Sequence, residues 1–240
     1  MNPSPAGGVT GTATFTPPPF AVTAITGAPY SGEEASERSQ TLIDGTHIFQ
    51  QTPGRRLYRD SLGRTRTERP LFLGLQVTDP PVLIEITDPV AGFQYTLDTE
   101  NRVAHRAALP RAETSARAAA PQAPAVARPR SSESQPQVSS EPLGTRMIEG
   151  VLVEGRRITT TLPAGMQGND RPIVLTTEAW VSPDLKTTVL SKTFDPRAGE
   201  NTFKIVHLSR LEPDPILFQP PPDYSMVDEK GEFTITCTRQ

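Results

Sequence analysis

The stretch VLIEITDPVAGFQYTLD, from Val82 to Asp98, decides the fold of this 240-residue chain. Apolar and polar residues alternate on both sides of its centre, where Pro89 and Gly92 interrupt the pattern. Alternation with a period of two places successive side chains on opposite faces of a strand, and a Pro/Gly segment between two such runs forms a turn. The stretch therefore predicts a half-buried antiparallel hairpin with strands over residues 82–87 and 93–98.

Similar hairpins are expected on the N-terminal side of this stretch. Asp44-Gly45 is a strong two-residue turn signal between strands over residues 35–42 and 47–51. Gly63 stands where a longer hairpin loop needs a positive φ, between strands over residues 56–59 and 64–69. One more strand is expected near residues 103–107.

The pattern resumes in the C-terminal part of the chain. Turns are expected near Glu154-Gly155, at residues 182–184 and at residues 195–199, with a loop over residues 163–172. No window carries the apolar stripe of an amphipathic helix. The chain is therefore predicted to be mainly β, with C-terminal strands over residues 147–153, 157–162, 173–181, 185–193 and 203–211.

Composition shifts divide the chain. Residues 1–29 are rich in Gly, Pro and Thr and predict a disordered or extended lead-in with one short strand around residues 20–25. Residues 110–142 contain Pro, Ala and Ser without apolar periodicity, which predicts a disordered linker. The expected order is thus a lead-in, an N-terminal hairpin half (30–109), the linker, a C-terminal hairpin half (143–228) and a tail or edge strand (229–240).

Neither half holds many large apolar residues. A small β unit buries too little surface to be stable alone. We therefore expect the two halves to complete a single curved antiparallel sheet that the linker interrupts.

Charge and cysteine content exclude several classes of protein. The net charge is −3 and the isoelectric point is about 5.7, so no global field favours nucleic acid or an anionic membrane. Cys237 is the single cysteine, which excludes an intramolecular disulfide and a cysteine-based metal site. No apolar run is long enough to span a bilayer. The first residues show no signal peptide, which leaves open an intracellular protein or one whose leader is missing from this sequence.

No motif of a catalytic, cofactor or metal site is present. His47, His105 and His207 lie far apart in the sequence, each inside an expected strand, and none has the spacing of a zinc or hydrolase motif. The segment 165–168 lacks the Lys-Ser/Thr of a phosphate loop. We therefore expect ordinary strand histidines, no cofactor, no metal and no enzymatic activity.

Arginines gather on the hairpin over residues 56–69. Arg64 and Arg66 are expected on one face, with Arg56 beside them, and guanidinium groups pair well with the phosphates of lipid or lipopolysaccharide. The alternative is a solvated hairpin face whose charges discourage edge-to-edge aggregation. Only Tyr58 could stack on bases among these arginines, so nucleic acid is not an expected partner.

The loop GNDRP, residues 168–172, is the densest polar cluster of the chain. Asp170 and Arg171 could present paired charges at a binding rim. Alternatively, the sequence simply makes a turn in which Pro172 holds Arg171 extended, and this interpretation is favoured. Trp180, near the end of a strand, is expected to anchor a core because of its large apolar area.

Two resemblances to known families add to this picture. The strand-turn-strand EAWVSPDL (178–185) and the ending EPDPILFQPPPDY (212–224) resemble the outer-membrane lipoprotein carrier family. The span from Tyr30 to about Val227, with YRDSLGR (58–64) and GNDRP, also resembles a group of uncharacterised secreted proteins of acidobacteria.

The carrier resemblance implies an unclosed β-barrel whose concave face shelters lipid chains. Carriers plug that face with helices and lack a long linker, so this chain departs from their pattern. The function expected from the resemblance is an exported protein of the periplasm or cell envelope that binds a hydrophobic or amphipathic ligand. The alternative is an interaction or sensor module whose edge strands or Pro-rich segments recruit an envelope protein partner.

Overall fold

A computed structural model describes residues 9–19, 22–52, 54–71, 81–110 and 135–239 of the chain. Almost all regular structure in these residues is strand, and the helical exception is one short 3₁₀ turn, η2 (Pro215–Phe218). The chain forms two compact units. The first unit contains residues 1–31, 55–119 and 210–240, and the second unit contains residues 32–54 and 120–209. The prediction of a mainly β protein is confirmed.

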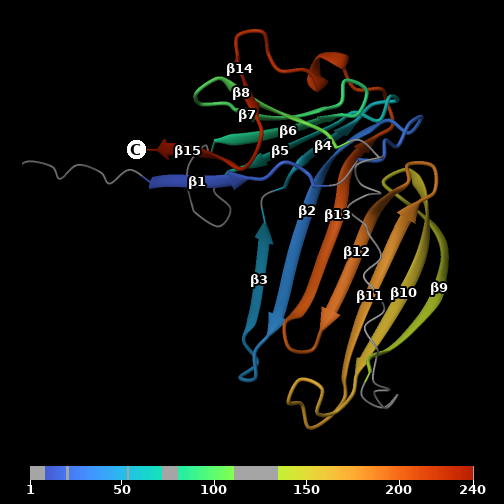
Figure 1. Ribbon diagram of the computed structural model, residues 1–240. Helices are drawn as coiled ribbons and strands as arrows, with labels where there is room; N and C mark the ends of the chain where they lie inside the picture. Colours follow the sequence, from blue (N-terminus) through green and yellow to red (C-terminus); the bar gives the residue numbers. More distant parts are fainter. Residues whose placement is uncertain (1–8, 20–21, 53, 72–80, 111–134, 240) are drawn as a thin grey trace, which may run out of the picture. The chain divides into compact units, whose positions relative to one another are not determined.

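The first unit is built on a sheet of hairpins. Its strands follow the order β14 (Ser225–Glu229), β8 (Val103–Ala108), β7 (Phe93–Asp98), β6 (Val82–Asp88), β5 (Thr65–Pro70) and β4 (Arg56–Arg59). All neighbours are antiparallel except β14, which runs parallel to β8 (Figure 1). A separate antiparallel ribbon pairs β1 (Val9–Phe15) with β15 (Phe233–Arg239).

Both faces of the central hairpin β6–β7 are covered. Ile86 and Leu97 pack with Ala104 and Phe218, the last residue of η2. Leu83, on the opposite face, packs against Phe15 and Ile235 of the β1–β15 ribbon and is 2% exposed. The hairpin predicted from the alternation is confirmed, but it is buried on both faces because segments from the two ends of the chain cover it.

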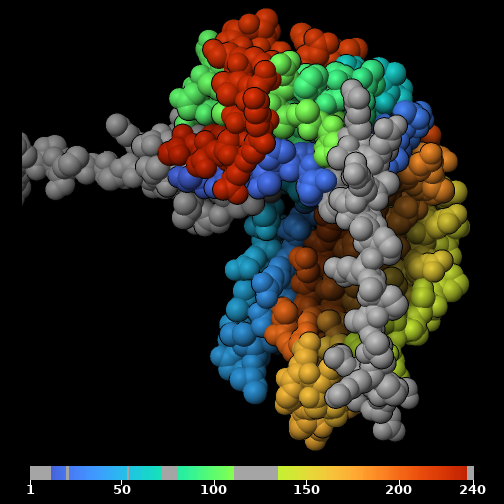
Figure 2. Space-filling model, in the orientation of Figure 1, coloured from blue at the N-terminus to red at the C-terminus, as the bar shows by residue number. Residues whose placement is uncertain are grey.

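The second unit is a sheet of long strands. Its order is β3 (His47–Thr52), β2 (Tyr30–Thr41), β13 (Gly199–Ser209), β12 (Thr187–Asp195), β11 (Ile173–Ser182), β10 (Val151–Leu162) and β9 (Gln137–Ile148). In both units the sheet order is linear, so neither sheet closes on itself. The β2–β3 hairpin, blue to teal, forms one outer edge of the second unit (Figure 2).

One predicted turn is wrong. The chain reverses at Glu149 and Gly150, both with positive φ, so that β9 and β10 pair directly across this point. The expected turn at Glu154-Gly155 lies instead inside β10. Gly155 is glycine for a different reason: a Cβ there would lie 2.6 Å from a ring carbon of Trp180. Trp180 itself is buried, as expected for a core anchor.

The ends of the chain are more ordered than the composition indicated. The lead-in contains β1, which the prediction missed, and the C-terminal tail contains its partner β15. The short strand expected around residues 20–25 is absent from residues 22–25, and residues 20–21 lie outside the described part. Most of the predicted linker, residues 111–134, also lies outside it, but β9 begins at Gln137, inside the expected linker.

The compact units do not coincide with the predicted hairpin halves. The β2–β3 hairpin groups with the C-terminal strands, and residues 210–240 group with the N-terminal strands. Residues that are far apart in the sequence, such as Phe218 and Ile86, contact each other, and these contacts determine the grouping. The amino-acid composition gives no sign of such contacts. The expectation that two halves complete a single sheet stays a prediction.

Candidate ligand groove

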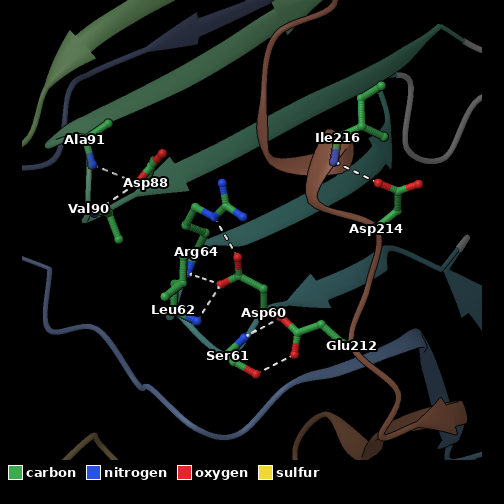
Figure 3. A network of polar contacts seen from close by, with 10 residues as sticks. All are labelled: Asp60, Ser61, Leu62, Arg64, Asp88, Val90, Ala91, Glu212, Asp214 and Ile216. Atoms are coloured by element: carbon green, nitrogen blue, oxygen red, sulfur yellow. Dashed lines mark hydrogen bonds and ion pairs between the residues drawn. The ribbon is translucent and has the colours of Figure 1, made fainter.

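Arg64 is a structural residue of the first unit. Its Nε lies 2.6 Å from Oδ2 of Asp60, and its side chain is 13% exposed (Figure 3). Oδ1 of Asp60 accepts hydrogen bonds from the backbone N–H groups of Leu62 and Arg64, at 3.1 and 2.8 Å. The guanidinium also lies over the ring of Phe218, 5.1 Å from its centre. Arg64 therefore ties the β4–β5 turn to the core.

Arg66 is occupied in a similar way. Its Nε lies 2.7 Å from Oε1 of Glu68, and its Nη1 donates to the carbonyl oxygen of Leu217 at 2.9 Å. Arg56 is mostly exposed, with Nη1 3.9 Å from the other oxygen of Glu68. The shared face expected for Arg64 and Arg66 is present, because both contact the segment that carries η2, and the phosphate site proposed there stays an untested hypothesis.

The segment from Glu212 to Phe218, part of the ending that resembles lipoprotein carriers, packs against the first unit (Figure 3). Glu212 accepts hydrogen bonds from the backbone N–H and the hydroxyl of Ser61. Asp214 caps η2 by accepting from the backbone N–H of Ile216 at 3.0 Å. These contacts give the motif a packing role, since they place Phe218 in the core.

Asp170 and Arg171 lie exposed in the loop between β10 and β11. Asn169 holds this loop, because its side-chain amide donates to the carbonyl oxygens of Pro163 and Arg171 at 2.8 and 2.7 Å. Its Oδ1 accepts from the backbone N–H of Gln167. Backbone hydrogen bonds within the loop, from Gly165 to Asn169 and from Met166 to Pro163, add to these contacts, and a binding role for the two charged residues stays untested.

A groove of about 390 Å³ lies on the second unit where β9, β10 and β11 meet. The register between β9 and β10 shifts at Gly155/Arg156, so that Leu143 has no partner across the ladder. Such a bulge bends the strand and opens the surface beside it. Several of the residues that line the groove have small side chains, which leaves space above the sheet. The lining comprises Pro142, Gly144, Thr145, Glu154, Gly155, Arg156, Ala179 and Val181.

Arg156 gives the groove its positive charge. Its Nη1 contacts the hydroxyl of Ser140 at 3.4 Å, and within the described residues no carboxylate lies within 4.0 Å of its guanidinium. The neighbouring Arg157 points to the opposite face and is paired with Glu141 and Glu178 at 2.8 and 2.6 Å. Alternation along β10 thus separates a structural arginine from one that faces the groove.

Apolar side chains continue the surface on both sides of Arg156. Leu152, Glu154, Arg156 and Ile158 share one face of β10 because their positions differ by two. Leu152 lies opposite Met147 on β9, and these two side chains are 46% and 62% exposed. Ile158 and Val181 are also exposed. The groove therefore combines one cation and one carboxylate with an open apolar surface.

Sequence reasoning missed this groove because of one misplaced turn. The period-two run Leu152, Glu154, Arg156, Ile158 is visible in the sequence, but a turn at Glu154-Gly155 splits it. Gly150 lies between two apolar runs, and as a glycine it is a turn signal that could have placed the strand correctly. The bulge at Leu143 has no comparable signal.

The three histidines lie in separate surroundings. His105 of the first unit stacks on Phe233, with ring centres 4.5 Å apart, and its Nδ1 lies 2.8 Å from Oε1 of Glu229. In the second unit, His47 shares a hydrogen bond with the hydroxyl of Thr41, and Nδ1 of His207 lies 3.5 Å from a carboxylate oxygen of Glu33. In the described ranges, no three His, Cys, Asp or Glu side chains form a group that could hold a metal. None of the helical structure described there is long and apolar enough to cross a bilayer.

No protein-family model matches the chain, and no curated protein sequence matches it. Among solved structures, it is similar to an uncharacterized conserved protein from Thermus thermophilus, with 10% identity, a TM-score of 0.41, and coverage of 84% of this chain and 91% of that one. MucB in the Pseudomonas aeruginosa MucA/MucB complex shows 12% identity and a TM-score of 0.40, and the match covers 84% of this chain and 58% of that one. LprF from Mycobacterium bovis shows 12% identity and a TM-score of 0.29, covering 79% and 90%.

Proposed function

We propose that the second unit binds an amphipathic molecule with an anionic group in the groove between β9 and β11. One observation carries this proposal: an arginine without a carboxylate partner among the described residues lies in a groove flanked by exposed Leu152, Met147 and Val181. A cleft of this volume is in the range of small-molecule sites. The acyl chain would cover the apolar side chains, and the acid group would pair with Arg156.

Two further parts of the proposal concern the class of protein. A non-enzymatic role belongs to the proposal, since pairing an acid group with Arg156 and covering apolar side chains requires no chemical step. Export to the cell envelope rests on the resemblance of the ending 212–224 to lipoprotein carriers. Fractionation of cells that express the complete gene product tests export, and recovery in the cytoplasm alone would contradict it.

Titration with a dansyl-labelled fatty acid tests the groove. We expect Arg156→Gln to weaken binding about tenfold, because a charge-assisted hydrogen bond to the acid group is lost. Glu154→Gln should strengthen binding, because it removes a negative charge beside the same group. Ala179→Leu should abolish binding by filling the floor.

Arg171→Gln is the matched control, since Arg171 is also an exposed arginine of the second unit but lies outside the groove. It should leave the affinity unchanged. Equal effects of Arg156→Gln and Arg171→Gln, or no saturable uptake of the probe, would reject the proposal.

A further inference from the structure

The outer strand β3 has an open edge. It pairs with β2 over six consecutive residues without a shift in register, and no further strand among the described residues lies beyond it. All six of its residues are exposed. The space-filling view shows this hairpin projecting at the border of the second unit (Figure 2). A regular edge of this kind presents a row of backbone N–H and C=O groups to any strand that approaches.

β3 lacks the features by which edge strands avoid pairing. Its sequence, HIFQQT, contains no Lys, Arg, Asp, Glu or Pro. The opposite edge of the same sheet, β9, carries Glu141, Pro142 and Arg146 and is interrupted by the bulge at Leu143. Charges, proline and bulges all disfavour strand addition. The two edges of the second unit are thus different, and only β9 is protected in this way.

Apolar side chains accompany the open edge. Phe49 is 62% exposed and lies opposite Ser39 of β2, and the partly exposed Ile48 lies opposite Gln40. Neither residue has an apolar partner across this ladder. At the tip of the hairpin Ile43 is fully exposed. An added strand would therefore gain both backbone hydrogen bonds and apolar contacts.

We propose that β3 pairs antiparallel with β3 of a second copy of this chain. An antiparallel pair centred on Phe49 is related by a twofold axis, which makes the contact self-complementary. It places the two Phe49 side chains opposite each other and Ile48 opposite Gln50. The strand carries no Lys, Arg, Asp or Glu, so no such charge meets its own copy across this twofold, and each exposed Phe49 gains an apolar neighbour that β2 does not give it. This contact is independent of the groove, which involves β9–β11.

Sedimentation of the full chain at micromolar concentration tests the proposal. We expect a dimer that Phe49→Lys converts to a monomer, because a charge placed opposite its own copy is repelled. Val138→Lys is the matched control: Val138 is an equally exposed apolar residue on the other edge strand, and its replacement should leave the dimer intact. Circular dichroism verifies that both variants fold.

A crosslinking variant gives a second measurement that does not depend on weakening the contact. In a Cys237→Ser background, Phe49→Cys should form a disulfide-linked dimer under mild oxidation, and Val138→Cys should not. A monomer at every concentration, a dimer that both lysine variants dissociate, or crosslinking through Val138→Cys alone would overturn the proposal. Saturation of β3 by an extended segment of a different protein, with the free chain monomeric, would overturn it as well.

Discussion

At the scale of single residues, pairs of neighbours in one strand have opposite roles. Arg156 faces the groove, whereas Arg157 is held by Glu141 and Glu178 on the other face. Arg59 differs from these two arginines because it is buried, and its Nε donates to the carbonyl oxygen of Ala28 at 2.9 Å. Burial lowers the pKa of its guanidinium. Arginines that are alike in the sequence thus receive different roles from contacts that only the fold creates.

Gly155→Ala should destabilise the second unit by about 1–3 kcal/mol, the usual cost of overpacking a core. The added Cβ would lie 2.6–2.8 Å from three ring carbons of Trp180, whose buried ring also lies against the guanidinium of Arg146 at 3.7 Å. Urea unfolding followed by circular dichroism measures the effect. Gly231→Ala is the control, because no atom lies within 4 Å of a Cβ there. Equal stability of the two variants would contradict the close packing.

At the scale of elements, ion pairs hold β14 against β8. The two strands run parallel from Val103 to Ala107, and Nε and Nη2 of Arg106 donate to the two carboxylate oxygens of Asp228 at 2.7 and 3.1 Å. The His105–Glu229 contact lies one position away on the opposite face. Parallel pairing needs a long connection, so these contacts select the position of a strand that arrives from a distant part of the chain.

The Arg106 hydrogen bond holds the pKa of the Asp228 carboxyl below its ordinary value of 3.8. Because the folded-state pKa is lower than the unfolded one, the stabilisation is complete above about pH 4 and is lost as the pH falls through the folded-state value. NMR titration of Asp228 should give a midpoint below 3.8, and Arg106→Gln should raise it toward 3.8.

Asp195 is the control for this titration. Hydrogen bonds from Arg197 hold its pKa low for the same reason, in the second unit. Its midpoint should stay low in the Arg106→Gln variant. An unchanged Asp228 midpoint in that variant would show that the ion pair is absent in solution.

At the scale of the whole molecule, each unit combines segments that are distant in sequence. Residues 210–240 supply Phe218 and Ile235 to the two cores of the first unit. A chain that ends after Ser209 should therefore lose hydrogen-exchange protection in β6 and β7 but keep it in β10–β12. Protection of β6 and β7 that equals that of the full chain would contradict the grouping. The amides of the second unit serve as the internal control.

Most of the hairpins, their alternation and the mainly β class follow from the sequence alone, because period-two patterning and turn residues act over a few neighbouring positions. The turn at Asp44-Gly45 and the β6–β7 hairpin are examples. Other features depend on contacts between distant segments of the chain. These are the strands added from the two ends of the chain, the bulge at Leu143 and the open groove beside Arg156. Only the tertiary structure decided these, because such contacts join residues far apart in sequence and leave no local pattern.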